Sequence, residues 1–239
     1  MIAEKHFEFT GETKVFCGIT LKRIRASISF RNIANGEVGG WVEKESNLSG
    51  DAWVSDNARV FGDAQVSDNA HVSGNAWIYD NAKVSDDAQV SGNAKVFGDA
   101  WVFGDAKVSD NAKVSGNAHV SGNAWIYDNA KVSDDAQVSG NAKVFGDAWV
   151  FGDAKVFGDA KVFGNAWVSG DACVYDNAQV SGNAWVSGDA CVYDNAQVSG
   201  NAKVFGNAKV SCDAKVSDDA QVSGNAKVFG EAWIFKWVS

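Results

Sequence analysis

From residue 49 onward, apolar and polar positions follow a period of six residues. An alanine stands at position 52 and at every sixth position through 232, which gives 31 alanines without a skip. Two residues after each alanine comes Val or Ile, from Val54 to Ile234. The remaining positions are polar or variable, and each unit ends in a turn-forming pair, so that the repeat reads A-x-V-[SFY]-[GD]-[DN].

This unit predicts a short β-strand followed by a corner. In A-x-V-[SFY] the side chains alternate, so Ala and Val face inward while the other two residues face outward. Val favours strands, whereas Gly, Asp and Asn tolerate the positive φ angles of a tight corner. Helical i, i+3, i+4 spacing does not occur in the sequence. A unit this small buries its apolar face only by stacking on copies of itself, which predicts a solenoid.

The repeats within the chain also indicate how the solenoid closes. If three units form one coil of 18 residues, residues 49–234 make about ten coils, or a rod roughly 50 Å long at ~4.8 Å per stacked strand. Residues 168–185 recur at 186–203 with only Lys203 in place of Trp185. The phrase SDDAQVSGNAKVFG, found at 85–98, 133–146 and 217–230, would then fall once on each of three faces. It therefore encodes shape rather than one functional site.

The unit resembles the hexapeptide repeat, in which a small residue follows an aliphatic one by four positions, as Ala58 follows Val54. FEFTGETKVFCGITLKRIRA (7–26) and GEVGGWVEKESNLSGDAWV (36–54) are similar to the opening segment of the YdcK-like branch, found in bacteria and on phages or prophages. This resemblance implies an all-β, single-stranded, left-handed parallel β-helix of triangular section. It also implies a weak link to acyltransferases, since fold alone does not determine function.

Residues 1–48 break the period and are expected to form a small N-terminal β cap, with 49–239 as the β-helix. HFEFTG and KVFCGITLKRIRA predict a β-pair around the turn GETK. Capping is the main interpretation, because a solenoid must protect its open edge. A sharper alternative is an anion site formed by the GEVGG glycines with three arginines, Arg23, Arg25 and Arg31.

The other end of the repeat, EAWIFKWVS, predicts either an aromatic cover or an open edge. Trp233, Phe235 and Trp237 could fold over the last coil. Otherwise the edge is a template for another copy, as in an end-to-end dimer or a longer stack.

Enzymes with the hexapeptide fold are expected to use a histidine on an outer face as a general base, with coenzyme A along the coils. His71 and His119 occupy the outward x position in identical surroundings, but 48 residues separate them, which predicts different faces. The simpler interpretation is that each histidine has no catalytic role and only occupies a solvated outward position. No insertion interrupts the 31 units, so the substrate loop of such enzymes is missing and the faces are expected to be flat.

Outward positions 18 residues apart are expected to stack in columns. Trp149, Trp167 and Trp185 form one column, with Phe145 and Phe163 a corner away. Like residues stack for local stability in any solenoid. The alternative is an association surface for a trimer or a protein partner, because exposed aromatic patches mark contacts.

Composition excludes several classes. The net charge of −9 argues against a nucleic-acid or anionic-membrane binder. The N-terminus lacks the apolar stretch of a signal peptide and no run approaches ~20 apolar residues, so a cytoplasmic protein of a bacterium or a phage-infected cell is expected. The cysteines lack metal spacing, and the Asp and Asn corners suit hydrogen bonding better than metal binding; the four cysteines are Cys17, Cys173, Cys191 and Cys212.

These observations favour a non-catalytic structural or binding β-solenoid that self-associates or binds a protein, with no cofactor. One alternative is an acyltransferase that uses acetyl-CoA. Another is a phage-borne acidic inhibitor or DNA mimic, although lysines at many outward positions dilute the acidic surface.

Overall fold

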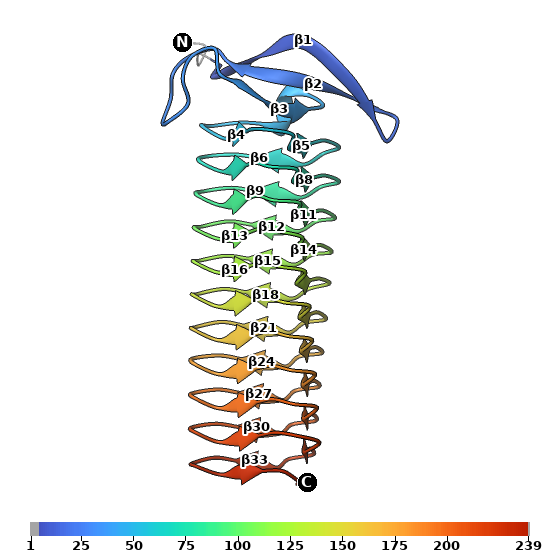
Figure 1. Cartoon of the computed structure of the whole chain (residues 1–239), viewed down its shortest axis with the longest axis vertical. Helices are drawn as coiled ribbons and strands as arrows, with labels where there is room; N and C mark the ends of the chain where they lie inside the picture. Colours follow the sequence, from blue (N-terminus) through green and yellow to red (C-terminus); the bar gives the residue numbers. More distant parts are fainter. Residues whose placement is uncertain (1–4, 239) are drawn as a thin grey trace.

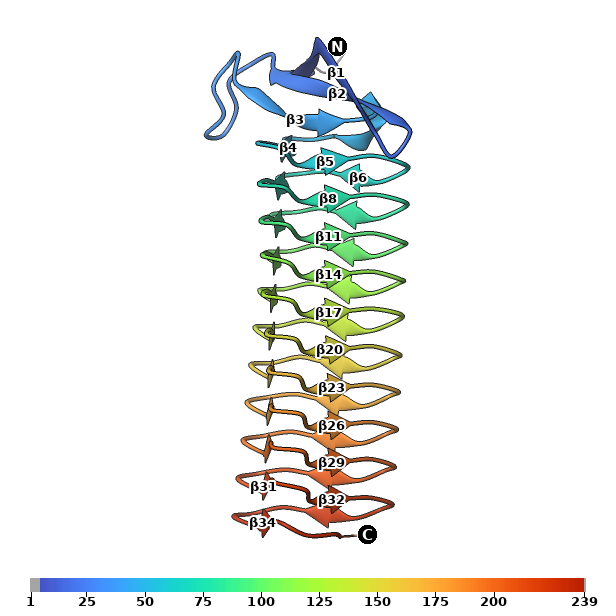
Figure 2. The same ribbon diagram turned by 45° about the vertical axis from the view of Figure 1, so that its right-hand side comes forward.

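The computed structural model, which describes residues 5–238, is a straight three-faced rod with a β cap at one end (Figures 1 and 2). Strands on one face are 18 residues apart, as in the pairing of Trp149 with Trp167, and all pairing along the rod is parallel. With ten or eleven coil strands on each face, the solenoid has about eleven turns and confirms the predicted fold class.

The first face is a sheet of 13 strands, of which the first two are antiparallel. Its strands are β1 (Phe7–Phe16), β2 (Ile19–Ala26), β3 (Val38–Val42), β5 (Arg59–Val60), β8 (Trp77–Ile78), β11 (Lys95–Val96), β14 (Lys113–Val114), β17 (Lys131–Val132), β20 (Trp149–Val150), β23 (Trp167–Val168), β26 (Trp185–Val186), β29 (Lys203–Val204) and β32 (Gln221–Val222).

The second face has 11 strands. They are β4 (Trp53–Val54), β7 (His71–Val72), β10 (Gln89–Val90), β13 (Lys107–Val108), β16 (Trp125–Ile126), β19 (Lys143–Val144), β22 (Lys161–Val162), β25 (Gln179–Val180), β28 (Gln197–Val198), β31 (Lys215–Val216) and β34 (Trp233–Ile234).

The third face has 10 strands. They are β6 (Gln65–Val66), β9 (Lys83–Val84), β12 (Trp101–Val102), β15 (His119–Val120), β18 (Gln137–Val138), β21 (Lys155–Val156), β24 (Cys173–Val174), β27 (Cys191–Val192), β30 (Lys209–Val210) and β33 (Lys227–Val228). A single 3₁₀ turn, η1 (Glu45–Asn47), precedes the first repeat.

The core is a continuous column of Ala and Val side chains, with Ile at positions 78 and 126, and is fully buried from Ala52 through Val222. Regular pairing covers two residues of each unit, but the hydrogen bonds extend over the predicted four. The Gln89 N–H donates to the Ala106 carbonyl and the Ser91 N–H to the Val108 carbonyl, both at 2.9 Å. The backbone of each coil is therefore bound to the next, and only side chains are free on the outer faces.

The cap hairpin differs from the prediction in its turn. β1 pairs antiparallel with β2 from Phe7 opposite Ala26 to Phe16 opposite Ile19, so the chain reverses at Cys17 and Gly18, whose φ angles are 49° and 79°. These angles suit a two-residue hairpin turn. The predicted turn GETK was wrong: it lies within β1, where Gly11 makes a bulge instead.

The cap and the rod join at β3, which pairs antiparallel with β2 and parallel with β5. Gly39 and Gly40 allow this contact, because a Cβ at Gly39 would lie 2.6 Å from the Val54 carbonyl oxygen and a Cβ at Gly40 2.8 Å from the Ala58 carbonyl oxygen. Between β2 and β3, residues 27–37 form a loop that hangs from the cap beside the first coils (Figure 1). Solenoid pairing thus already begins inside residues 1–48.

At the far end, the chain starts a further strand on the first face. Val238 bridges to Val222, and its N–H donates to the Gln221 carbonyl at 2.8 Å. The aromatic side chains here do not cover the last coil: Trp233, Phe235 and Trp237 are 50–68% exposed.

Candidate binding sites

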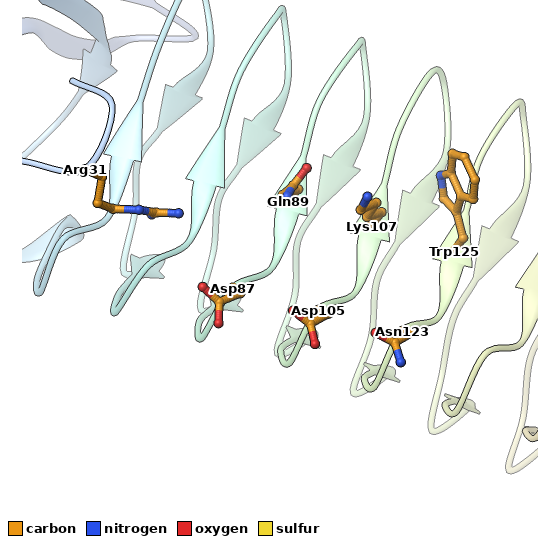
Figure 3. Close-up of a pocket in the computed structure, with 7 residues that line it drawn as sticks. All are labelled: Arg31, Asp87, Gln89, Asp105, Lys107, Asn123 and Trp125. Atoms are coloured by element: carbon orange, nitrogen blue, oxygen red, sulfur yellow. The ribbon is translucent and has the colours of Figure 1, made fainter.

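A groove runs along the second face beneath the cap loop. Arg31 of the loop stands at one end and Trp125 at the other (Figure 3). Two adjoining hollows of about 590 and 360 Å³ share Arg31, Asp87 and Gln89 in their linings. The loop therefore gives this face the concavity that the unbroken repeat did not predict.

Two columns of side chains line the groove. Gln89, Lys107 and Trp125 project from successive strands, while Asp87, Asp105 and Asn123 come from the preceding corners (Figure 3). Their 18-residue spacing places equivalent groups side by side along the rod. The groove thus combines two cationic groups, two carboxylates, two amides and one indole ring.

His71 lies near the head of this groove, where Arg31 donates to the Asn69 carbonyl. Its Nε2 lies 3.0 Å from the Ser55 Oγ. Burial, assisted by the positive charge of Arg31, lowers the pKa of His71 below its ordinary value of 6.5. The imidazole is therefore neutral at pH 7, which is the state that a general base requires.

The contact between His71 and Ser55 nevertheless follows from the repeat. An outward residue reaches the residue 16 positions earlier, on the preceding coil. Trp101 Nε1 donates to Ser85 Oγ at 3.1 Å, and Trp149 Nε1 donates to Ser133 Oγ at 3.0 Å. The Ser–His pair is thus one case of a rule that also applies to tryptophan.

The other histidines have different environments. His119 projects from the third face and lines a hollow of about 270 Å³ with Trp101 and Phe103. It therefore lies on a different face from His71, as predicted. His6 is a buried cap residue whose Nε2–H donates to the Ala52 carbonyl at 2.9 Å, and burial lowers its pKa.

The first face carries an aromatic patch, defined here as Trp149, Phe151, Trp167, Trp185 and Phe205. The tryptophans pack edge to face, with ring centroids 5.7 and 5.3 Å apart along the column. Trp167 and Trp185 remain 38% and 39% exposed. The expected column therefore forms and presents an apolar surface to solvent.

Charged groups surround this patch. Lys131 lies over Trp149 and Lys203 over Trp185, at 5.2 and 5.9 Å from the ring centroids. The corner that follows each strand carries an uninterrupted acidic rail, and the corner that precedes it is mostly asparagine. The acidic rail consists of Asp135, Asp153, Asp171 and Asp189, and the opposite edge consists of Asn129, Asp147, Asn165 and Asn183.

Other columns of outward side chains form away from the patch. Tyr127, Phe145 and Phe163 stack with nearly parallel rings 4.8–4.9 Å apart, at the end of second-face strands. Cys173 and Cys191 lie opposite each other on neighbouring strands of the third face, and both are free thiols. Within residues 5–238, no group of three His, Cys, Asp or Glu side chains is placed to hold a metal ion.

The three predicted anion-site arginines have separate partners. Arg25 forms an ion pair with Glu8, Arg23 lies over the Trp41 ring at 5.0 Å, and Arg31 reaches the second face. Gly39 and Gly40 of GEVGG pack against the first coil, and a Cβ at Gly36 would meet no atom within 4 Å. Arg31 is thus the one of the three arginines that lines the groove.

The tip of the cap hairpin forms a strap over the first face, defined here as Lys14 and Phe16, which the sequence did not predict. Phe16, at the hairpin tip, packs edge to face on Trp77 with centroids 4.8 Å apart. Arg59 lies over Phe16 at 4.4 Å, and Lys14 lies over Trp41 at 3.8 Å. The only signal in the sequence was that aromatic residues such as Trp77 occupy outward positions in the coils next to the cap.

Sequence comparison identifies the repeat. A family model described as the YdcK beta solenoid repeat matches residues 64–80, 88–104, 136–152 and 178–194. No curated protein sequence matches the chain. In the residues that the structure describes, no helix is long and apolar enough to cross a membrane.

Solved structures with some likeness include two UDP-N-acetylglucosamine acyltransferases. The protein from Bacteroides fragilis is 16% identical with a TM-score of 0.37, and the match covers 64% of each chain. The Arabidopsis protein is 11% identical with a TM-score of 0.43, covering 77% of this chain and 66% of that one. The match thus spans just under two thirds of either protein, and identities this low carry no activity across. The chain is thus a β-solenoid protein, and four of its segments match the YdcK beta solenoid repeat.

Proposed function

We propose that this protein is a non-catalytic binding solenoid that self-associates through the aromatic patch of its first face. The exposed tryptophan column carries the proposal. Its rings lie on a flat, rigid face, where an association surface needs little ordering of side chains. Tryptophan is also the residue type most enriched among energetically dominant interface residues.

A second copy is the occupant that best fits the patch. The side-chain columns of two copies have the same spacing along the rod, so each ring of one copy meets an equivalent ring of the other. Within one copy, Phe16 of the cap packs on Trp77 of the same face, so an outward ring of this face accepts an aromatic partner.

The charges favour parallel copies related by a two-fold axis along the rod. This arrangement places the acidic rail opposite the mostly asparagine edge, so that Asp171 of one copy faces Asn165 of the other. Antiparallel copies would instead place the two acidic rails against each other, with like charges opposed across a partly desolvated contact.

Analytical ultracentrifugation over a range of concentrations tests association. We expect a reversible dimer that Trp167→Lys with Trp185→Lys converts to a monomer. Lys occupies the same outward position in neighbouring coils, so the variant should keep its fold and circular dichroism. Trp101→Lys, on the third face, is the matched control and should leave the dimer intact. A wild-type monomer at all concentrations would overturn the proposal.

Cross-linking tests the orientation. In a background with the native cysteines replaced by serine, Trp149→Cys should form a disulfide-linked dimer only if the copies are parallel. Antiparallel copies would bring position 149 opposite position 185 instead. Cross-linking of Trp149→Cys only when mixed with Trp185→Cys would therefore refute the parallel arrangement while supporting self-association.

A second candidate function is acyl transfer from acetyl-CoA, which the neutral His71 beside the groove favours. His71 would take the proton of an acceptor hydroxyl as that oxygen attacks the thioester carbonyl, and the proton would pass to the departing CoA thiolate. Calorimetry with acetyl-CoA tests this candidate. Binding that His71→Gln leaves intact, together with CoA release that it abolishes, would support an enzyme over a binding module.

A further inference from the structure

The groove beneath the cap loop has the dimensions of a site for an elongated ligand. It crosses four coils of the second face, from His71 to Trp125. At ~4.8 Å per coil, its equivalent side chains therefore repeat over roughly 14 Å. A single small molecule would contact one or two of these coils, whereas an extended chain would contact all of them.

The charges in the groove balance. Arg31 and Lys107 provide two positive groups, while Asp87 and Asp105 provide two negative ones. A strongly anionic or cationic chain would meet repulsion from one pair for each attraction to the other. The lining therefore favours an uncharged ligand with many hydrogen-bonding groups.

The two carboxylates are free to accept hydrogen bonds. Further along the same corner, Asn123 donates to Asn141 and Asn141 donates to Asp159, so those groups satisfy one another. Asp87 and Asp105 follow each other without an asparagine between them, and no side chain in residues 5–238 donates to either. Their oxygens thus remain available as acceptors for ligand hydroxyls.

An extended peptide does not fit these features as well. A peptide usually binds by adding a strand to free backbone groups at a sheet edge. On the second face those groups are taken, because the Lys107 N–H donates to the Ala124 carbonyl as part of the ladder between coils. Recognition in the groove must therefore come from side chains alone.

Trp125 adds an apolar platform at the far end. Trp125 is 41% exposed and stands out from its strand (Figure 3), with the Lys143 and Lys107 ammonium groups 5.7 and 6.0 Å from its ring centroid. An indole face suits the C–H groups of a pyranose ring, while the planar Asp, Asn, Gln and Arg groups suit its hydroxyls. We propose that the groove binds an uncharged oligosaccharide, whose successive sugar units lie along successive coils.

A glycan array that contains neutral, anionic and cationic oligosaccharides tests the proposal. The wild-type chain should retain at least one neutral oligosaccharide of four or more units, and titration with that compound should change the tryptophan fluorescence. Trp125→Gln and Arg31→Gly should each weaken binding by about tenfold or more, in line with the loss of one buried contact. Gln stands at several equivalent second-face positions, and Gly accepts the positive φ of Arg31.

Trp101→Gln, on the third face, is the matched control and should bind like the wild type. The association variant with Lys at positions 167 and 185 should also bind, which separates this proposal from the dimer. Retention of charged glycans only, or of none, would overturn the proposal. So would equal binding by the wild type and by Trp125→Gln combined with Arg31→Gly.

Discussion

At the scale of single residues, the corner position in the left-handed region holds successive coils together. Glycine or aspartate stands at nearly every such corner, and most of these aspartates do more than tolerate the conformation. Asp134, at φ 59°, accepts a hydrogen bond from the Gly152 N–H of the next coil at 3.2 Å, and Asp86 accepts one from Gly104 at 3.0 Å. Glycine supplies conformational freedom, whereas aspartate also supplies a bond between coils.

Replacing Asp134 by Ala should therefore remove a hydrogen bond and leave, in the left-handed region, a side chain that cannot offset the strain by hydrogen bonding. The free energy of unfolding should decrease by about 1–3 kcal/mol, which is measured as a lower midpoint of denaturant unfolding. Asp134→Asn is the control, because asparagine tolerates this region and keeps an acceptor oxygen. If both variants lost the same stability, the carboxylate charge rather than the corner geometry would be responsible.

Histidine shows why a residue pattern alone does not define a site. His71 and His119 have identical sequence neighbours, yet one lies under the cap loop and the other on an open face. The difference comes from Arg31, which is 40 residues before His71 in the sequence. The sequence could predict that the two histidines occupy different faces, because that follows from counting. It could not predict which face the loop would cover.

At the scale of elements, the strap joins the cap to the first face through cations stacked on aromatic rings. Burial, with the charges of Arg59 and Arg23, lowers the pKa of Lys14 from 10.5 to about 8. The folded protein thus loses this proton at a lower pH than the unfolded chain. Because the unfolded state then binds more protons, stability increases with pH above about 8.

This shift predicts that the denaturant concentration at which the cap is half unfolded rises between pH 8 and pH 9.5. The measurement stops there because tyrosine ionises near pH 10. Arg59→Met should bring the pKa of Lys14, measured by NMR, closer to 10.5, since it removes the largest charge effect. Its midpoint should then depend less on pH. A Lys14 pKa near 10.5 in the wild type would contradict the packing of the strap.

The elements of the rod were predictable, and those of the cap were predictable only in part. Strand, corner and 18-residue coil follow from local chemistry that recurs in every unit. The cap occurs once, so its strand register cannot be inferred by comparing copies. GETK therefore suggested a turn that Cys17 and Gly18 make instead. The groove and the strap depend on where the cap segments fold back, which is long-range packing.

At the scale of the whole molecule, the acidic surface is distributed along the corners and separated by outward lysines. On the first face, Lys95, Lys113 and Lys131 form an unbroken run before the aromatic patch. An inhibitor that imitates DNA would need a continuous negative surface, since phosphate charges lie close together along a duplex. The alternation of signs therefore fits a binding rod better than a DNA mimic.

The repeat also separates the shape of the rod from the composition of its faces. Each coil contacts only its neighbours, so stability is a sum of local terms. A deletion of six residues preserves every strand and corner but moves each later strand to the preceding face. A deletion of 18 residues shortens the rod and leaves the faces aligned. The two deletions thus change different properties of the same molecule.

Deletion of residues 170–175 should give a folded solenoid in which Trp185 moves to the second face and Cys191 takes its place beside Trp167. The patch is then broken, and we expect a monomer in the ultracentrifuge with an unchanged β-sheet circular dichroism spectrum. Deletion of residues 206–223 removes a full coil beyond the patch and should retain the dimer, although it removes three times as many residues. If the six-residue deletion also dimerised, association would depend on the repeat itself and not on the aligned tryptophans.

If the six-residue deletion failed to fold, the repeat units would not be interchangeable between faces. The phrase SDDAQVSGNAKVFG argues against that outcome, because the strands of its three copies occur on all three faces.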